Sequence, residues 1–300
     1  MISAAFSWRV PSWHPVVIVA ILGLLIWYFE AVSRRETSAT RRQKVAFAGG
    51  SATLLLASSW PIGDLARASS LAAIVIQRQL LVLLAAPMLL VGLPMTVTTR
   101  LTRPAPVDWI ARHVVHPVTA IVVATLLLGL TALPIVIDTS VTSPILRGTA
   151  SVAVLAAGVV LWLPVIKRVP GVARLSDMAK GGYLLAQSIA PTFLSFIWIL
   201  ALHPLYGSIH GQHAALGISP LTDQQNSGYL AKLGNFGVLW TVAFIFFVRS
   251  SDDEEEVHAT LHWVDVERAL ERVERHDGHG SELLDVPDDA LDERSNQDPS

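Results

Sequence analysis

The stretch Ile74–Val97, IVIQRQLLVLLAAPMLLVGLPMTV, is apolar over nearly its whole length. A helix needs ~20 mostly apolar residues to cross a hydrocarbon core of about 30 Å. In lipid, every backbone N–H and C=O must be satisfied within the segment, so such a run predicts a transmembrane helix. Six further runs share this composition: Pro15–Val32, Val45–Trp60, Pro117–Ile137, Ile145–Ile166, Tyr183–Leu202 and Asn235–Val248. The last run is short, so we expect its helix to begin near Gly228 and to include Lys232. The sequence therefore predicts an all-α membrane protein, a seven-transmembrane-helix bundle.

Charge divides the 300-residue chain into two parts. The whole chain is 52% hydrophobic with a mean hydropathy of +0.50, and its formal net charge is -2. Residues 251–300 hold 17 Asp/Glu and 4 Arg, whereas the first 250 residues hold 18 Lys/Arg and 7 Asp/Glu. We expect a basic membrane domain over 1–250 and an acidic tail over 251–300. Apolar spacing in the tail predicts a short amphipathic helix over about Val257–Arg275 after an acidic linker, and disorder from His276 onward. The tail is read either as a solubilising appendage or as a docking segment for a basic cytoplasmic partner.

Positive residues indicate the orientation of the predicted bundle. The loops after the first, third and fifth runs hold twelve Lys/Arg, and the opposite side holds four. Lys and Arg accumulate in cytoplasmic loops. We therefore expect a multi-pass membrane protein with the N-terminus outside and the acidic C-terminal tail in the cytoplasm.

Histidine, methionine and carboxylate side chains are the metal ligands that remain available, because the chain has no cysteine. His203, His210 and His213 are the clustered histidines on the expected outer side, and three imidazoles can hold copper. The alternative reading is that they are solvated loop histidines in a Gly-rich segment. The sequence therefore leaves two interpretations open, copper as a cofactor held by these histidines or no bound cofactor.

A second set of polar residues is expected to form an outer-face polar cluster: Asp64, Arg78, Arg147, Asp223, Gln224 and Gln225. Arg78 either snorkels to the interface or is a fixed cation inside the bundle mouth, and a cation there should have a carboxylate partner. Asp64 and Asp223 are the first choices for that partner. Asp223 is alternatively an N-cap of the last helix.

Several segments resemble the CtaG-type cytochrome c oxidase assembly factors. GISPLTDQQNSGYLAKLG at Gly217–Gly234 matches the family pattern Leu-Ser-Pro-Leu-x-Asp-Gln-Gln-x-x-Gly nearly position for position over Ile218–Gly228. The run QLLVLLAAPMLLVGLP is similar to the family's third-span signature, and the following segments also resemble the family: WPIGDLA, WLPVIKRV, RLSDMAKGGYLLAQSIAPTFL and HPLYGSIHG. The resemblance covers roughly Trp60–Arg249. It implies a multi-span bacterial membrane protein associated with copper-centre assembly in haem–copper oxidases.

The chain departs from the family at the expected metal ligands. The resemblance places a His-x-x-x-His pair at Ile74 and Arg78, and neither residue can ligate copper through its side chain. At the start of the fifth run, LRGTAS replaces the His and Glu-His residues that the family usually carries. We therefore expect the third span to bind copper weakly or not at all.

The favoured function is a non-enzymatic membrane assembly factor or scaffold for a respiratory cytochrome c oxidase, linked to copper-centre maturation on the outer face. Its expected partners are the lipid bilayer and cytochrome c oxidase subunits, with no nucleic acid. No phosphate-binding loop or protease motif indicates an enzyme. The alternative is a transporter or channel for a small solute or metal, which would need polar groups continuing through the membrane interior.

Overall fold

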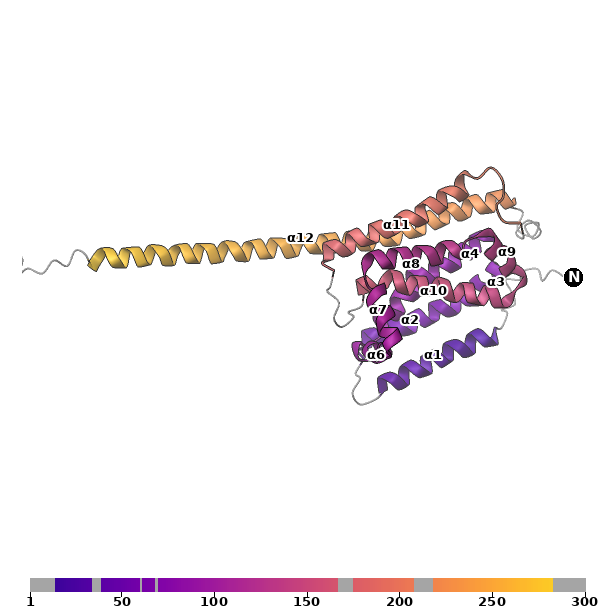
Figure 1. The fold of residues 1–300 in the computed structure, drawn as a ribbon, viewed down its shortest axis with the longest axis horizontal. Coiled ribbons are helices and arrows are strands. Elements are labelled where there is room, and N and C mark those ends of the chain that lie inside the picture. The colour runs from indigo at the N-terminus through magenta and orange to yellow at the C-terminus, as the bar shows by residue number, and fades with distance from the viewer. Residues whose placement is uncertain are drawn as a thin grey trace, which may run out of the picture. The chain divides into compact units, whose positions relative to one another are not determined.

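The fold is all-helical in a computed structural model that describes residues 14–33, 39–59, 61–67, 70–166, 175–207 and 218–282. Within these residues no strand occurs. The helices, labelled in Figure 1, are α1 (Pro15–Ser33), α2 (Arg41–Ser58), α3 (Ile62–Arg67), α4 (Leu71–Gln79), the π-helix η1 (Leu80–Ala85), α5 (Ala86–Gly92), α6 (Met95–Leu101), α7 (Ala105–Val114), α8 (Pro117–Leu130), α9 (Pro134–Thr142), α10 (Pro144–Ile166), α11 (Asp177–Leu200) and α12 (Pro220–Glu282).

The helices long and apolar enough to cross a membrane number six, or seven if the bent pair α7–α8 counts as one span. The six described spans are Pro15–Ser33, Arg41–Ala66, Leu71–Gly92, Pro144–Ile166, Asp177–Leu200 and Pro220–Ser250. The expectation of a helical membrane protein is confirmed, and the earlier start of the last span is also observed. Six of the seven predicted runs overlap these spans, but the runs Ile74–Val97 and Tyr183–Leu202 extend past the observed ends at Gly92 and Leu200.

The prediction of a single helix over the fourth run, Pro117–Ile137, is wrong. α8 ends at Leu130 after 14 residues, and α9 begins at Pro134. Pro134 has no N–H to continue the hydrogen-bond ladder and disfavours helical geometry at the residue before it. At 1.5 Å per residue, α8 is about 21 Å long, shorter than a typical hydrocarbon core. α7 and α8 meet at 97°.

The third span contains a local change of helical pitch. α4 passes into η1 directly after Gln79, and α5 continues to Gly92. A π-helical insertion displaces carbonyls from the regular ladder. The carbonyl of Val82 accepts a hydrogen bond from Trp162 Nε1 on α10 at 2.9 Å. Gly158 permits this approach, because a Cβ there would lie 2.9 Å from Val82 Cα.

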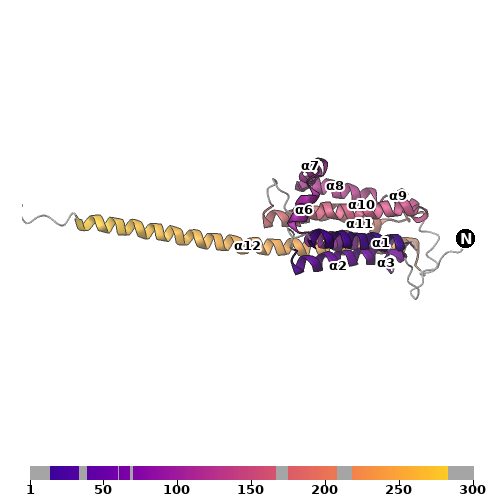
Figure 2. The same cartoon turned by 90° about the horizontal axis from the view of Figure 1, so that it is seen from below.

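The main hydrophobic core lies between α2, η1, α5, α8, α10, α11 and α12. Figures 1 and 2 show α2, α8, α10 and α11 running roughly parallel within one bundle. Its most buried members include Leu161, Leu184 and Leu239. α1 joins this bundle near its C-terminal end, where Tyr28 stacks on Phe47 with ring centroids 3.8 Å apart. The Tyr28 hydroxyl donates to the carbonyl of Gly92 at 3.0 Å.

Contacts divide the chain into two units, Met1–Phe247 and Val248–Ser300. In the second unit, α12 stays helical through 251–256 and continues to Glu282, beyond the end predicted near Arg275. No proline interrupts 251–282. Residues 283–300 lie outside the described residues.

Candidate functional site

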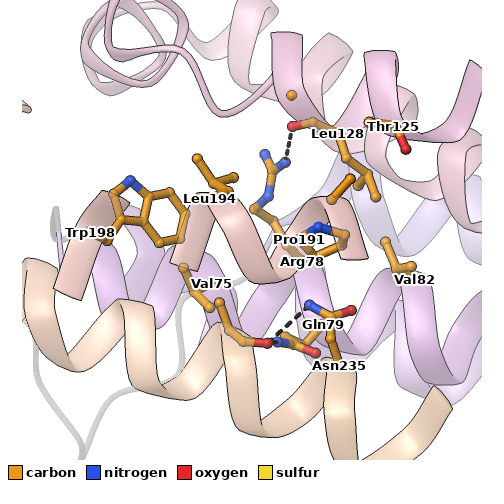
Figure 3. Close-up of a pocket in the computed structure, with 13 residues that line it drawn as sticks. Val75, Arg78, Gln79, Val82, Thr125, Leu128, Pro191, Leu194, Trp198 and Asn235 are labelled. Carbon is orange, nitrogen blue, oxygen red and sulfur yellow. Dashed lines mark hydrogen bonds between the residues drawn. The ribbon is translucent and has the colours of Figure 1, made fainter. Parts of the chain in front are cut away.

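Polar side chains gather at one end of the bundle, called here the α3/α9 end because α3 and α9 lie there in Figures 1 and 2. Arg78, on α4, lies about 10 Å along the axis from the start of that helix at 1.5 Å per residue. Its guanidinium reaches α8, whereas the neighbouring Gln79 points toward α12 (Figure 3). Arg78 Nη2 donates to Leu128 O at 2.7 Å and to Thr131 Oγ1 at 2.9 Å. Nη1 donates to Thr131 O at 3.1 Å.

Arg78 therefore caps the C-terminus of α8. The last carbonyls of a helix have no N–H partners of their own, and no water satisfies them inside a bilayer. A cation at this end also interacts favourably with the helix dipole. Tyr206 completes the cap, because its hydroxyl donates to Ala132 O at 3.0 Å and accepts from Trp198 Nε1 at 2.8 Å. Burial raises the pKa of Tyr206 to about 12, so its hydroxyl keeps its proton at neutral pH.

The prediction that a carboxylate pairs with Arg78 is wrong. Within the described residues Arg78 forms no ion pair, and its partners are two carbonyls and a hydroxyl. The reason is the break after Leu130, which leaves carbonyl oxygens beside α4. These carbonyl oxygens accept the hydrogen bonds from the guanidinium that a carboxylate was expected to accept.

Arg147 on α10 has a similar role at the end of α9. Its Nε donates to Ser140 O at 3.0 Å, and its Nη2 donates to Ser140 O at 2.8 Å and to Val141 O at 2.7 Å. Ser140 and Val141 belong to the last turn of α9. Both arginines of the predicted polar cluster thus bind helix C-termini.

Asp223 caps a helix other than its own. Its Oδ2 accepts from Leu71 N at 2.6 Å, and its Oδ1 accepts from Ser70 Oγ at 3.1 Å, so the carboxylate lies at the N-terminus of α4. The carboxylate is buried, with 3% of Asp223 exposed. The alternative prediction of an N-cap on the last helix is wrong, because Ser219 Oγ accepts from Thr222 N there at 3.1 Å.

The two glutamines after Asp223 bind the segment that follows α11. Gln224 Oε1 accepts from Leu205 N at 2.7 Å, and Gln225 Nε2 donates to Ala201 O at 3.4 Å. We call Asp223, Gln224 and Gln225 the DQQ clamp. It joins the start of α12 to α4 and to residues 201–205.

Glycines bring α12 close to its neighbours below the DQQ clamp. A Cβ on Gly228 would lie 2.8 Å from the carbonyl oxygen of Ser195 on α11. A Cβ on Gly234 would lie 2.5 Å from Gln79 Oε1. Gln79 uses this space to donate from Nε2 to Ala231 O at 3.0 Å. The segment with the strongest family resemblance is therefore a helix-joining element.

Asp64 does not join Arg78. Its Oδ1 lies 2.7 Å from His14 Nε2, which ties α3 to the start of α1. Of the predicted copper ligands, His203 is exposed, and His210 and His213 lie outside the described residues. The part of the chain that the structure describes contains no group of three or more His, Cys, Asp or Glu suited to a metal ion.

Two cavities reach Arg78. The smaller, of ≈ 160 Å³, lies between α4, η1, α8, α11 and α12, and includes Gln79, Thr125 and Asn235 among its lining residues (Figure 3). The larger, of ≈ 760 Å³, lies toward α1 and α10 and includes Arg147. Gln79, Asn235 and Tyr206 were missed by sequence reasoning. The glutamines on either side of Arg78 were the one available signal, since three polar residues in an apolar span need internal partners.

One of the comparisons with known proteins found a match. A family model described as cytochrome c oxidase caa3 assembly factor matches residues 23–253, more than half of the chain. No curated protein and no solved structure matches. The matched region begins within the first span and includes the other spans, both arginine caps and the DQQ clamp. The chain belongs to the cytochrome c oxidase caa3 assembly factor family.

Proposed function

We propose that the protein is a non-enzymatic scaffold of the bacterial plasma membrane that supports maturation of the copper centre in a caa3-type cytochrome c oxidase, without holding copper in its third span. Family membership supports the assembly role. The observation that carries the metal-free part is the guanidinium of Arg78 bound to the end of α8.

Copper does not fit the polar centre around Arg78. A copper ligand must offer a lone pair, whereas a guanidinium offers only N–H donors and stays protonated. Ile74, at the other position of the expected His pair, has an aliphatic side chain. The nearby oxygens of Leu128 and Thr131 already accept from Arg78. The positive charge at this position is the guanidinium of Arg78, not a metal ion.

The scaffold role follows from what the polar groups do. The arginine caps satisfy helix ends, and the DQQ clamp binds α12 to α4 and to residues 201–205. These contacts give the α3/α9 end a defined shape without a metal. We propose that this end faces outward and presents an oxidase subunit for copper insertion by another component.

Deletion of the gene, followed by complementation, tests this proposal. We expect loss of assembled caa3-type oxidase, measured by its haem and copper absorbance, by oxidase activity and by copper content of isolated membranes. The wild-type chain should restore all three. Asp223→Ala should restore them poorly because it opens the DQQ clamp, whereas Asp177→Ala, which removes an i,i+3 pair with Lys180, should restore them fully. Normal oxidase with a full copper complement in the deletion strain would contradict the proposal.

One observation favours a second candidate, a transporter or channel for a small solute or metal. Both cavities reach Arg78 from different sides of α4. Purified protein in sealed vesicles discriminates between the candidates. Dissipation of a solute or metal gradient only in vesicles that contain the protein favours transport over scaffolding.

A further inference from the structure

The short helix α7 (Ala105–Val114) lies across one end of the bundle. Figures 1 and 2 show it at the end opposite α3 and α9. It meets α8 at 97°, so it runs across the direction of the spans and adds almost nothing to the depth that the chain crosses. α7 contacts α8 and α10, yet none of its 10 residues, all of which the structure describes, is buried. Most of the helix surface is therefore open to whatever surrounds this end of the bundle.

α7 has an apolar side and a polar side. Val107, Ile110 and Val114 recur at helical spacing, so they lie on one face. Asp108 and Arg112 each lie two positions from Ile110, which places them ~160° away around the helix axis at ~100° per residue. Arg112 Nε donates to Asp108 Oδ2 at 2.8 Å, so the charged pair is satisfied on its own side of the helix. The helix is therefore amphipathic.

The apolar side of α7 is open, and an aromatic ring lies at its border. Val107 is 41% and Ile110 53% exposed. Trp109 is 62% exposed and lies ~100° from Ile110, between the apolar and polar sides. Its ring packs against His113, with ring centroids 4.2 Å apart. Tryptophan is enriched where a membrane meets water, because it has an apolar body and one polar N–H.

The size of the apolar side favours lipid over a protein partner. A specific protein interface buries about 800 Å² per partner. Even a large aromatic side chain buries only about 150–250 Å², so three partly exposed side chains fall well short of that area.

The length of α8 also indicates lipid at this end. Its 14 residues span about 21 Å, so a hydrocarbon core of about 30 Å extends past at least one end of the helix by up to about 9 Å. A helix that lies in the membrane surface immerses its apolar face by about 5–10 Å, which matches this difference.

We propose that α7 is a membrane-surface helix whose partner is the lipid itself. Val107 and Ile110 insert among the acyl chains, and Asp108 and Arg112 face water. The bend between α7 and α8 is then the point where the chain turns from the membrane surface into the bilayer. α7 would thereby fix the depth of α8 and of the arginine cap at its far end. This placement is separate from oxidase assembly and holds whether or not the proposed function is correct.

Single-cysteine labelling of the full chain tests the proposal, because the chain has no cysteine of its own. A nitroxide is attached at one position at a time, and each labelled protein is reconstituted into phosphatidylcholine vesicles. Collisions with oxygen, which concentrates in hydrocarbon, are compared with collisions with a water-soluble nickel chelate. The variants on α7 are Val107→Cys, Ile110→Cys, Asp108→Cys and Arg112→Cys. Two positions on each side keep the comparison independent of the folding of any one variant, which circular dichroism checks.

We expect the ratio of oxygen to nickel collisions to be several-fold higher at Val107 and Ile110 than at Asp108 and Arg112. Leu126→Cys, at a residue of α8 that is 56% exposed, gives the hydrocarbon reference, and Arg42→Cys, at the exposed start of α2, gives the water reference. A water-like ratio at all four positions overturns the proposal. A hydrocarbon-like ratio at all four also overturns it, because α7 would then be part of a span. Low collision rates with both reagents at Val107 and Ile110 would show that protein covers this side, and would equally contradict a lipid partner.

Discussion

Arg78→Met tests whether the guanidinium caps α8. Methionine keeps an unbranched apolar stem of similar length but has no N–H donor. The variant leaves Thr131 O without the partner that it has at 3.1 Å. Leu128 O loses the 2.7 Å bond but keeps a bond from Thr131 Oγ1 at 3.1 Å. One carbonyl is thus left unpaired and another loses its shorter bond.

The size of the effect follows from three contributions. Each hydrogen bond from a charged donor contributes ~1.5–3 kcal/mol, so two bonds to carbonyls contribute roughly 3–6 kcal/mol. Removing a desolvated charge returns part of this, and water entering the adjoining cavities offers Thr131 O a substitute partner. We expect a net loss of ~2–3 kcal/mol in the free energy of unfolding. At about 2–4 °C per kcal/mol for a domain of this size, the unfolding midpoint should fall by roughly 4–12 °C.

The assay is thermal unfolding of the detergent-solubilised full chain, followed by tryptophan fluorescence and by circular dichroism. Arg112→Met is the matched control, because Arg112 forms an exposed i,i+4 pair with Asp108 at 2.8 Å. Such pairs contribute less than about 1 kcal/mol. A double-mutant cycle with Thr131→Val isolates the bond to the hydroxyl, and we expect a coupling of ~1 kcal/mol.

An Arg78→Met midpoint no lower than that of Arg112→Met, together with zero coupling to Thr131, would refute the cap. The guanidinium would then contribute little, as a side chain that snorkels to the interface does.

Three further predictions concern the DQQ clamp, helix packing and topology. Asp223→Asn should lower the free energy of unfolding by ~1 kcal/mol, because a neutral amide replaces the carboxylate that accepts from Leu71 N and Ser70 Oγ; a midpoint equal to that of Asp177→Asn would contradict this. Gly228→Ala should cost ~1–3 kcal/mol because its Cβ would meet Ser195 O at 2.8 Å, whereas Gly237→Ala, with open space, should stabilise α12 by up to ~1 kcal/mol; equal midpoints would remove the argument for close packing. Reporter fusions after Arg42, Arg103, Arg174 and Ser300 should report the cytoplasm, and those after Asp64, Val141 and Gly211 the outside; two adjacent loops on the same side would remove a span.

Helix positions were largely predictable because the apolar runs are long. Ile145–Ile166 and Pro15–Val32 differ from α10 and α1 by only one residue at an end. The break after Leu130 was missed because the apolar run continues through it, and Pro134 was its only local signal. η1 was also missed, since Leu80–Ala85 has the composition of an ordinary apolar helix.

The polar partners were less predictable because they are distant in the chain. Arg78 is 50 and 53 residues from Leu128 and Thr131, and Asp223 is 152 residues from Leu71. The sequence indicates that a cation in a span needs partners. It does not indicate carbonyls, because a carbonyl acceptor is available only where a helix ends inside the bundle. Local capping rules likewise assigned Asp223 to its own helix.

Copper titration of the purified full chain tests the central claim, that a guanidinium takes the place of a metal ion at the polar centre of this assembly factor. The titration is run on wild type and on a His203/His210/His213 triple-Ala variant, after adventitious metal has been removed from both proteins. We predict that the triple variant binds no copper tightly, because the described residues around Arg78 offer no ligand set. Tight binding lost in the triple variant would place a copper site on the histidine segment and leave the arginine cap intact. Tight, stoichiometric binding that survives the triple change would contradict the metal-free third span.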